Sequence, residues 1–452
     1  MNDNFITSHD SFYMLGIGGV SMSALAKILH FSGKRVAGSD ICPNRYTREL
    51  SSMGIEVHSG HPEGKIRGYG ALVYTDAVKP DDVQLREALE LGITLISRGK
   101  LLAEVSKMYK NVIAVAGCHG KTTCASMLSH IFDAAGKNFT CHIGGADNAF
   151  SNCKIRGNDY FITEACEYRK NFLLLKPDIA VILNSDADHL ECYGGKEDLL
   201  AAYAAFMSSS RKSLCLYGDP CGRGTLTFGT DSSAYYSAAG IRSDRGRYSF
   251  ELCEGGRAAC RISLKVFGRH NILNALAAAG AAGMAGIRSE DIKRGLELFR
   301  GVERRFELIG KFNGAEVVAD YAHHPNEIAA VLKTAAEVCR GRVFVVFQPH
   351  TYSRTKNLFD DFVRVLSPIN NLLIYKTFAA REYFDAEGSA LALSRKLKNA
   401  RYAECERDIE YFLKDTGEGD MALVLGAGDI YDIAKNVVNR QNSTGIPRTS
   451  QE

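Results

Sequence analysis

A lysine and two threonines follow a glycine turn in the stretch NVIAVAGCHGKTTCA, residues 111–125. The apolar, β-branched run before the turn is typical of a buried strand. From Lys121 to about Ala135 the pattern predicts a helix. A strand, a glycine turn and a helix N-terminus together form an anion site, because free backbone N–H groups and the helix dipole both face the bound charge. We therefore expect Lys121 to reach the β- and γ-phosphates of a nucleotide and the Thr122 hydroxyl to bind Mg²⁺.

This loop is shorter than the common nucleotide-binding pattern, in which a glycine stands five residues before the glycine of the GK pair. Val115 occupies that position here. An ordinary glycine turn before a helix is the alternative, but the flanking strand and helix lie where a phosphate loop requires them. The residues expected to hold the phosphates of ATP are Gly117, Cys118, His119, Gly120, Lys121, Thr122 and Thr123.

Polar side chains follow two further apolar runs that read as core strands. Glu164 comes directly after residues 160–163, and His189 lies in the polar segment after residues 179–183. Because ligands gather at the C-terminal ends of the strands in a parallel sheet, we expect both residues on the same edge as Lys121. Each alone would be an ordinary loop residue. Three polar clusters at three strand ends together indicate a metal–phosphate site.

A second glycine turn lies near the N-terminus, in the segment GIGGVSM at residues 16–22. It follows an apolar run directly and is similar to G-x-G-x-x-G, with Ser21 in place of the last glycine. Asp40 ends the next apolar run, 24 residues after Gly16, at the position of a ribose-binding acid. The pattern alone leaves both a dinucleotide site and a purely structural turn open.

The remaining pattern, which must position these groups, is that of an α/β protein. A length of 452 residues suggests about three domains. Short apolar strands alternate with helices up to about residue 107 and again from about residue 301, which predicts doubly wound parallel sheets. Between them, residues 213–267 hold short strands with glycine turns, which indicates a small antiparallel patch. That patch is expected to comprise residues 225–229, 234–241, 248–252 and 262–268.

Composition excludes several classes of protein. The net charge of +3 is too small to indicate a nucleic-acid or membrane surface, and no apolar run reaches the length of a membrane span. The polar N-terminal segment lacks the apolar core of a secretory signal, so we expect a cytoplasmic protein. The 13 cysteines include no CxxC pair, which argues against a disulfide framework. From about residue 440 the composition predicts a disordered tail.

Eight segments together carry a resemblance to a known family. In chain order they are GIGGVSMSALA, GCHGKTT, EACEYRKNFL, NSDADHLECY, HNILNALAA, GVERRF, DYAHHPNEI and FQPHTYSRT. From Phe12 to about Ala434 the chain resembles the Mur ligases of peptidoglycan synthesis, whose phosphate loop has the same short form. The resemblance implies three domains: a Rossmann-like UDP-sugar domain at 1–107, a central P-loop ATPase with a mostly parallel sheet at 108–303, and a Rossmann-like amino-acid domain at 304–452.

The resemblance also implies roles for individual residues, carried over by position. The UDP part would lie against Gly16, Gly18, Gly19, Ser21 and Met22, with Asp40 nearby. The Mg²⁺ ligands would be Thr122, Glu164 and His189. Further ATP contacts would come from Asn271, Asn274 and Arg304 or Arg305. The incoming amino acid and the reacting carboxylate would meet near Tyr321, His323, His350 and Arg354, with His323 as the candidate base.

Within the family, the chain is most similar to the branch that adds L-alanine to the lactyl carboxylate of UDP-N-acetylmuramate. That reaction uses ATP and Mg²⁺, passes through an acyl phosphate and releases ADP and phosphate. The implied partners are these two small substrates, without nucleic acid or a membrane, in a monomer or homodimer. The chain departs from the family at Cys118, Glu191 and Thr351, where Thr, Asp and, in some members, Arg stand. Carboxylate recognition would therefore depend on Arg354.

Three other functions remain open from the sequence. A murein-peptide ligase would join a preformed peptide to the same sugar nucleotide, although the segment ACEYRKNF is less acidic than is usual in that branch. A nicotinamide-dependent oxidoreductase using the first glycine turn would leave the phosphate loop unexplained. The non-enzyme alternative is an ATP-binding module that senses the UDP-sugar.

Overall fold

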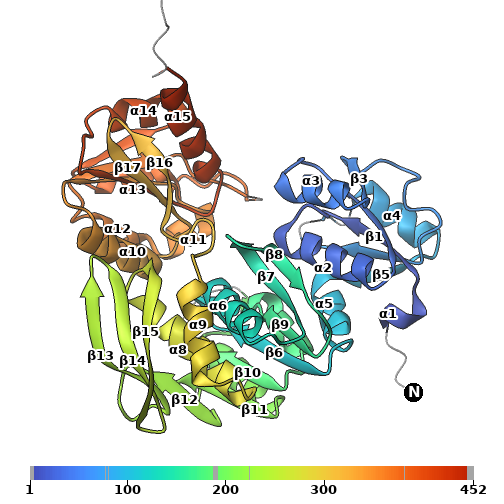
Figure 1. The fold of residues 1–452 in the computed structure, drawn as a ribbon. Helices are drawn as coiled ribbons and strands as arrows, with labels where there is room; N and C mark the ends of the chain where they lie inside the picture. Colours follow the sequence, from blue (N-terminus) through green and yellow to red (C-terminus); the bar gives the residue numbers. More distant parts are fainter. Residues whose placement is uncertain are drawn as a thin grey trace, which may run out of the picture. The chain divides into compact units, whose positions relative to one another are not determined.

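The computed structural model describes residues 5–76, 78–79, 81–186, 192–222, 224–380 and 382–444. These residues form three β-sheets of five, ten and six strands (Figure 1). The chain divides into two compact units. The first unit comprises Met1–Arg242, Ser249–Lys265 and Asn271–Arg300, and the second comprises Ser243–Tyr248, Val266–His270 and Gly301–Glu452. The first unit thus holds the first two sheets apart from residues 243–248 and 266–267 of the second sheet, while the domain boundaries at 107/108 and 303/304 stay predictions.

The N-terminal sheet is parallel, as the strand pattern predicts, and has the Rossmann-like organisation that the family resemblance implies. Its strands, in order across the sheet, are β3 (Glu56–Ser59), β2 (Arg35–Asp40), β1 (Ser11–Leu15), β4 (Ala71–Tyr74) and β5 (Thr94–Ser97), and all neighbours are parallel. Because the strand order reverses at β1, the glycine turn after β1 lies at the switch point where such sheets bind ligands. The helices of this part are α1 (Phe5–Ser8), α2 (Val20–Phe31), α3 (Arg45–Ser52), α4 (Val83–Glu90) and α5 (Arg98–Ser106).

The central sheet is mostly parallel. Its order is β15 (Arg257–Phe267), β14 (Arg247–Glu254), β13 (Tyr236–Asp244), β12 (Leu226–Gly229), β11 (Lys212–Leu216), β10 (Ile179–Ile182), β6 (Asn111–Ala116), β9 (Tyr160–Glu164), β7 (Phe139–Asp147) and β8 (Ser151–Ile155). The strands from β13 to β7 in this order pair in parallel, and β8 is antiparallel to β7. The other elements are α6 (Lys121–Ala134), the 3₁₀ helix η1 (Tyr168–Leu174), α7 (Lys196–Ser208), α8 (His270–Met284) and α9 (Ser289–Leu298).

The antiparallel patch is confirmed for three of its four expected strands. β13, β14 and β15 are neighbours joined by two-residue turns, which only antiparallel strands allow. The expectation is wrong for β12, which pairs in parallel with both β11 and β13. Because β12 is only four residues long, the nine-residue loop before it and the six-residue loop after it suffice to return the chain to the same edge of the sheet.

The sheet of the second unit is also almost wholly parallel. Its order is β16 (Glu307–Phe312), β17 (Ala315–Asp320), β21 (Met421–Leu425), β18 (Val343–Phe347), β19 (Asn371–Tyr375) and β20 (Ala400–Ala403), with only β16 antiparallel to its neighbour. Its helices are α10 (Pro325–Val338), α11 (Tyr352–Asn357), α12 (Phe359–Leu366), α13 (Ala390–Lys396), α14 (Glu406–Leu413) and α15 (Ile430–Thr444). Since α15 continues to Thr444, the disordered tail predicted from about residue 440 is wrong for its first residues.

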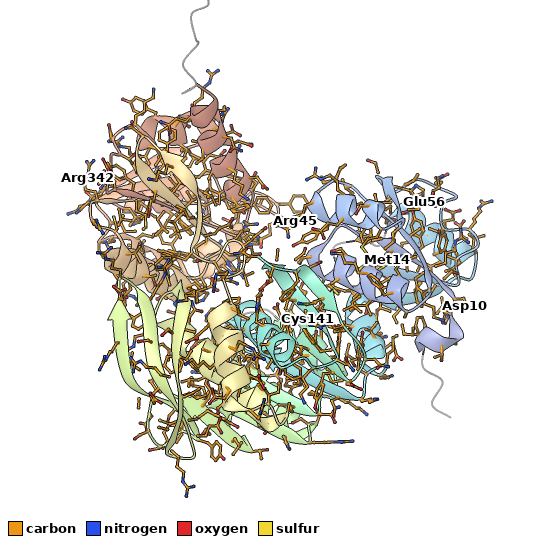
Figure 2. The ribbon with its side chains drawn as sticks, viewed as in Figure 1. Asp10, Met14, Arg45, Glu56, Cys141 and Arg342 are labelled. Atoms are coloured by element: carbon orange, nitrogen blue, oxygen red, sulfur yellow. The ribbon has the colours of Figure 1, made fainter. Side chains whose placement is uncertain are left out.

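Buried strands account for the core of each part of the chain. Figure 2 labels Met14 on β1 and Cys141 on β7, and both side chains are fully buried. Burial raises the pKa of the Cys141 thiol to about 12, so it packs as a neutral apolar group. Every helix in the described part of the chain is too short or too polar to span a membrane.

Candidate active site

The phosphate loop connects β6 to α6, as predicted from the sequence. Gly117 and Gly120 have φ angles of 128° and 85°, in a backbone region open mainly to glycine. The surroundings constrain Gly120 further, because a Cβ there would collide with the side-chain oxygen of Asn274. β6 lies between β9 and β10, so the polar segments that follow these three parallel strands share one edge of the sheet.

The ammonium group of Lys121 turns back into its own loop. It donates to the carbonyl oxygens of Gly117 at 2.6 Å and Cys118 at 3.3 Å, and to Oε1 of Glu167 at 2.8 Å. Burial lowers the pKa of Lys121, but the charge and the hydrogen bond of Glu167, with contributions from Cys166 and Cys118, together hold the pKa above its usual value. Lys121 is therefore a cation across the physiological range, as a ligand of phosphate must be.

Thr122 and Glu164 lie together, as expected of two Mg²⁺ ligands. The Thr122 hydroxyl donates to Oε2 of Glu164 at 3.1 Å, and the backbone N–H of Gly144 donates to the other carboxylate oxygen. Neighbouring ligands of an octahedral Mg²⁺ with bonds of about 2.1 Å are about 3.0 Å apart. Two hard oxygen donors at this separation fit that ion.

The third expected Mg²⁺ ligand, His189, lies outside the described residues, as does Glu191. Within the part of the chain that the structure describes, no group of three or more His, Cys, Asp or Glu side chains could hold a metal. A protein contribution of two oxygens still suits Mg²⁺, because this ion usually keeps waters and substrate phosphates among its ligands.

The segment that follows β10 holds the phosphate loop in shape. Asn184, which follows β10, accepts from the backbone N–H of His119 and donates to the His119 carbonyl, both at 3.0 Å. The Cys118 thiol donates to the carbonyl oxygen of Asp186 at 2.6 Å. The Cys118 side chain thus helps to hold the loop in shape.

The two asparagines of α8 meet the phosphate loop. Asn274 donates to Asn271 at 3.0 Å, and both side chains are more than nine-tenths buried. The side-chain oxygen of Asn274 lies where a Cβ of Gly120 would be. The structure therefore brings Asn271 and Asn274 to the loop, which supports their assignment to the nucleotide site.

The first glycine turn is held by the acid expected beside it. Oδ2 of Asp40 accepts from the backbone N–H of Gly18 in the turn at 2.8 Å, and Oδ1 accepts from that of Cys42, in the loop after β2, at 3.1 Å. A surface hollow of about 320 Å³ opens next to Asp40, lined also by Arg48 and His58. Asp40 thus has a structural task whether or not it also contacts a ribose.

Ser21 and Met22 lie in the first turn of α2, which follows the glycine turn. The Ser21 side chain contacts polar groups, whereas that of Met22 does not. Ser21 bonds Nε2 of His142 at 2.8 Å, and the Arg98 guanidinium approaches the same hydroxyl at 3.5 Å. Burial, aided by the charge of Arg98, lowers the pKa of His142 to about 3, so this histidine is neutral. The Met22 side chain is buried in the core, so a ligand would meet its backbone.

In the second unit, the loops after β17 and β18 bring two histidines together. The rings of His323 and His350 lie 5.6 Å apart, and the ring of Tyr321 lies 5.3 Å from that of His323. Nδ1 of His323 lies 2.9 Å from the Tyr321 carbonyl oxygen, which can only accept, so Nδ1 carries the hydrogen. This tautomer leaves Nε2 of the neutral ring as the proton-accepting nitrogen.

Arg354 on α11 lies beside His350. Its Nη1 approaches Nδ1 of His350 at 3.4 Å. Burial, with the nearby His323 and Arg354, lowers the pKa of His350 to about 4, so His350 is neutral at pH 7. The second unit thus offers a guanidinium next to the neutral His350, with His323 beside them, a set that can hold a carboxylate and accept a proton.

The two candidate arginines for ATP belong to the second unit, with different surroundings. Arg304 donates to the carbonyls of Gly426 at 3.2 Å and Gly428 at 2.8 Å, and its guanidinium lies over the rings of Tyr321 and Tyr431. Arg305 lies 5.3 Å from the centre of the Tyr321 ring. Because Arg304 is committed to the fold, Arg305 is the better candidate for a phosphate contact.

Sequence reasoning missed two buried acids, one in each unit. Glu167 holds Lys121, and Asp320 accepts from the backbone N–H groups of Phe306 and Ala322, both at 2.8 Å. Burial raises the pKa of Asp320 to about 6. Both acids stand at strand ends, within three residues of Glu164 or Tyr321, which is the signal that could have identified them.

Three family models match successive parts of the chain. They are the Mur ligase family catalytic domain at residues 11–110, the Mur ligase middle domain at 115–282 and the Mur ligase glutamate ligase domain at 304–428. A UDP-N-acetylmuramate–L-alanine ligase of Lachnospira eligens is 40% identical over 94% of this chain and 97% of its own length.

Two solved structures show the same architecture. The UDP-N-acetylmuramate–alanine ligase of Thermotoga maritima has a TM-score of 0.84 and 26% identity, covering 96% of this chain and 99% of its own. A murein peptide ligase of Psychrobacter arcticus has a TM-score of 0.73 and 22% identity, covering 95% of this chain and 98% of its own. At that identity the second likeness concerns the fold alone.

Proposed function

This chain belongs to the Mur ligase family, and we propose that it uses ATP to join L-alanine to the lactyl carboxylate of UDP-N-acetylmuramate. The observation that carries this proposal is its 40% identity, over nearly the whole chain, to a UDP-N-acetylmuramate–L-alanine ligase. The reaction belongs to peptidoglycan synthesis and is assigned to the cytoplasm, where ATP is available. UDP-N-acetylmuramate would bind at the glycine turn after β1 and in the hollow beside Asp40.

The first step must activate a carboxylate, which is a poor electrophile. A lactyl oxygen attacks the γ-phosphorus, ADP leaves, and an acyl phosphate forms. Phosphoryl transfer needs charge neutralisation and positioning more than covalent help. Lys121 supplies a positive charge at the phosphates, and Thr122 and Glu164 would hold Mg²⁺, which neutralises phosphate charge when bound. The Asn274 side chain lies against Gly120 of the loop and donates a hydrogen bond to Asn271.

The second step is attack of the alanine amine on the acyl carbon, with phosphate as the leaving group. The amine must lose a proton to attack, and Nε2 of His323 is the proposed acceptor. His350, kept neutral by burial, adds no positive charge that would repel an ammonium. Arg354 is proposed to hold a carboxylate, because a guanidinium can donate two parallel hydrogen bonds to it.

Replacement of Arg354 by lysine is expected to lower kcat/KM for L-alanine by about tenfold or more, although the charge is kept. An ammonium cannot reproduce the paired donors of a guanidinium. Steady-state kinetics with L-alanine as the varied substrate measure this. Arg364→Lys, at an exposed position of α12, is the matched control and should behave as wild type. If both variants turn over like wild type, Arg354 contributes only general positive potential.

The proposed function is tested by following the products of one turnover. Enzyme, ATP and UDP-N-acetylmuramate labelled with ¹⁸O in the lactyl carboxylate are mixed with L-alanine, or with a cell-wall peptide in its place. Release of ADP and phosphate should require L-alanine, and one labelled oxygen should appear in the phosphate, because the bridging oxygen of an acyl phosphate leaves on phosphorus. Turnover with the peptide alone would indicate a murein-peptide ligase, and unlabelled phosphate or stoichiometric AMP would exclude the acyl phosphate.

A further inference from the structure

Glu167 is a buried charge at the nucleotide site that neither step of the proposed reaction uses. It lies between β9 and η1, three residues after Glu164, and its side chain has no solvent exposure. Oε1 accepts from Lys121 at 2.8 Å, whereas Oε2 has no hydrogen-bond partner among the described residues. A buried carboxylate is tolerated only beside a compensating charge, and Lys121 is the cation bonded to it.

Lys121 has no N–H left for a phosphate in this arrangement. An ammonium carries three hydrogens, and its three acceptors here are Glu167 and the carbonyl oxygens of Gly117 and Cys118. A nucleotide phosphate that engages Lys121 must therefore take the place of one of these acceptors. The only charged one of the three is Glu167, which would also repel the phosphate directly.

We propose that Glu167 is a positioning residue that holds Lys121 within the phosphate loop before nucleotide binds and competes with the nucleotide phosphates for it. This inference rests on the proposed function, because it requires the loop to bind a nucleotide. The carboxylate keeps the loop ordered around its lysine, and each nucleotide phosphate that engages Lys121 competes with Glu167 for it. The consequence is a lower affinity for ATP and ADP than the loop would otherwise have, which favours release of ADP after the reaction.

Glu167→Gln removes the charge and keeps the shape of the side chain. Because a hydrogen bond to a charged partner contributes more than one to a neutral partner, Lys121 is released more easily from glutamine than from glutamate. Affinity for ADP with Mg²⁺, measured by titration calorimetry without the other substrates, is expected to rise about tenfold. In steady-state kinetics, KM for ATP should fall by more than any change in kcat.

Asp159→Asn is the matched control. Asp159 forms a lysine–carboxylate pair with Lys110 at 2.6 Å. The two residues directly precede β9 and β6, at the opposite end of these strands from the phosphate loop. This control should leave ADP affinity unchanged. Thermal unfolding of each variant separates a change in affinity from a change in stability. If Glu167→Gln does not fold, Glu167→Asp replaces it, since the shorter side chain cannot keep the 2.8 Å bond to Lys121 and the same gain is expected.

The outcomes separate this inference from the proposed function. If the wild-type protein fails to bind ADP, the proposed function is wrong. If the wild-type protein binds ADP, and the folded Glu167 variant binds it equally or more weakly, the competition proposed here is wrong while the function stands. Failure of both Glu167 variants to fold would assign the pair to domain stability and would also overturn the inference.

Discussion

Replacing Lys121 with alanine is expected to lower kcat for ligation by about 100-fold or more. The reason is the position of Lys121 at the first residue of α6, where its charge would stabilise the phosphoryl group during transfer. Affinity for UDP-N-acetylmuramate should stay near the wild-type value, because the glycine turn after β1 belongs to a different sheet. Product formation and calorimetric titration with the sugar nucleotide measure the two effects.

Lys121→Ala should also lower the free energy of unfolding, because Lys121 is paired with the buried Glu167. Removing one partner of a buried ion pair leaves the other charge uncompensated, which costs about 3 kcal/mol or more. Urea unfolding should therefore show Lys121→Ala to be less stable than wild type, and Glu167→Gln in the same chain should restore part of the loss. Lys110→Ala is the control, since its exposed pair with Asp159 contributes little. Near-normal turnover of Lys121→Ala would contradict the assignment of the loop.

The strands that the sequence predicted are those with continuous apolar runs. The core strands expected at residues 160–163 and 179–183 appear as β9 (Tyr160–Glu164) and β10 (Ile179–Ile182), each with an end shifted by one residue. Such runs identify a parallel strand because both faces of it are buried. β7 and β8 lack this signal: FTCHIGGAD mixes polar residues and glycines with few apolar ones, and their pairing shifts register between His142 and Asp147. The strand conformation of β7 and β8 depends on pairing, of β7 with β9 and of β7 with β8, and the local sequence does not predict such pairing.

Placement at strand ends explains why part of the candidate site could be predicted. Thr122 and Glu164 are 42 residues apart in sequence, yet the parallel pairing of β6 with β9 places Oγ1 of Thr122 at 3.1 Å from Oε2 of Glu164. The expectation needed only the direction of the strands and the rule that ligands gather at their C-terminal ends. The roles of these residues, including the amino-acid groups of the second unit, stay predictions until substrates are bound.

The sequence does not predict which hydrogen-bond and packing partners a polar side chain has in the folded protein. The motif GVERRF offers two adjacent arginines, and only packing shows that Arg304 is held by two carbonyls and two aromatic rings. The Lys121–Glu167 pair likewise depends on the path of the loop after β9, where Arg169 and Lys170 adopt positive φ angles of 52° and 56°. Left-handed backbone at non-glycine residues depends on the surrounding structure, so composition does not reveal it.

Replacement of Glu164 by glutamine is expected to raise the Mg²⁺ concentration for half-maximal activity by about 100-fold. Glutamine has nearly the same shape and can still accept from Thr122 or from the Gly144 N–H, so the fold should be kept. It lacks the negative charge that makes a carboxylate a strong ligand for a hard cation, and the metal would depend on Thr122, waters and phosphates. Glu197→Gln, at an exposed position in the first turn of α7, is the matched control.

The measurement is a Mg²⁺ titration of ADP release at saturating ATP, UDP-N-acetylmuramate and L-alanine, together with urea unfolding of each variant. If Glu164 is a metal ligand, the Mg²⁺ titration curve of Glu164→Gln should move to higher concentrations. Stability should stay close to wild type, because glutamine can still accept in part from the Thr122 hydroxyl and the Gly144 N–H that Glu164 binds. A purely structural glutamate predicts the reverse: a less stable protein whose Mg²⁺ curve overlays that of wild type. The latter result would remove Glu164 from the metal site and leave Thr122 as its sole described ligand.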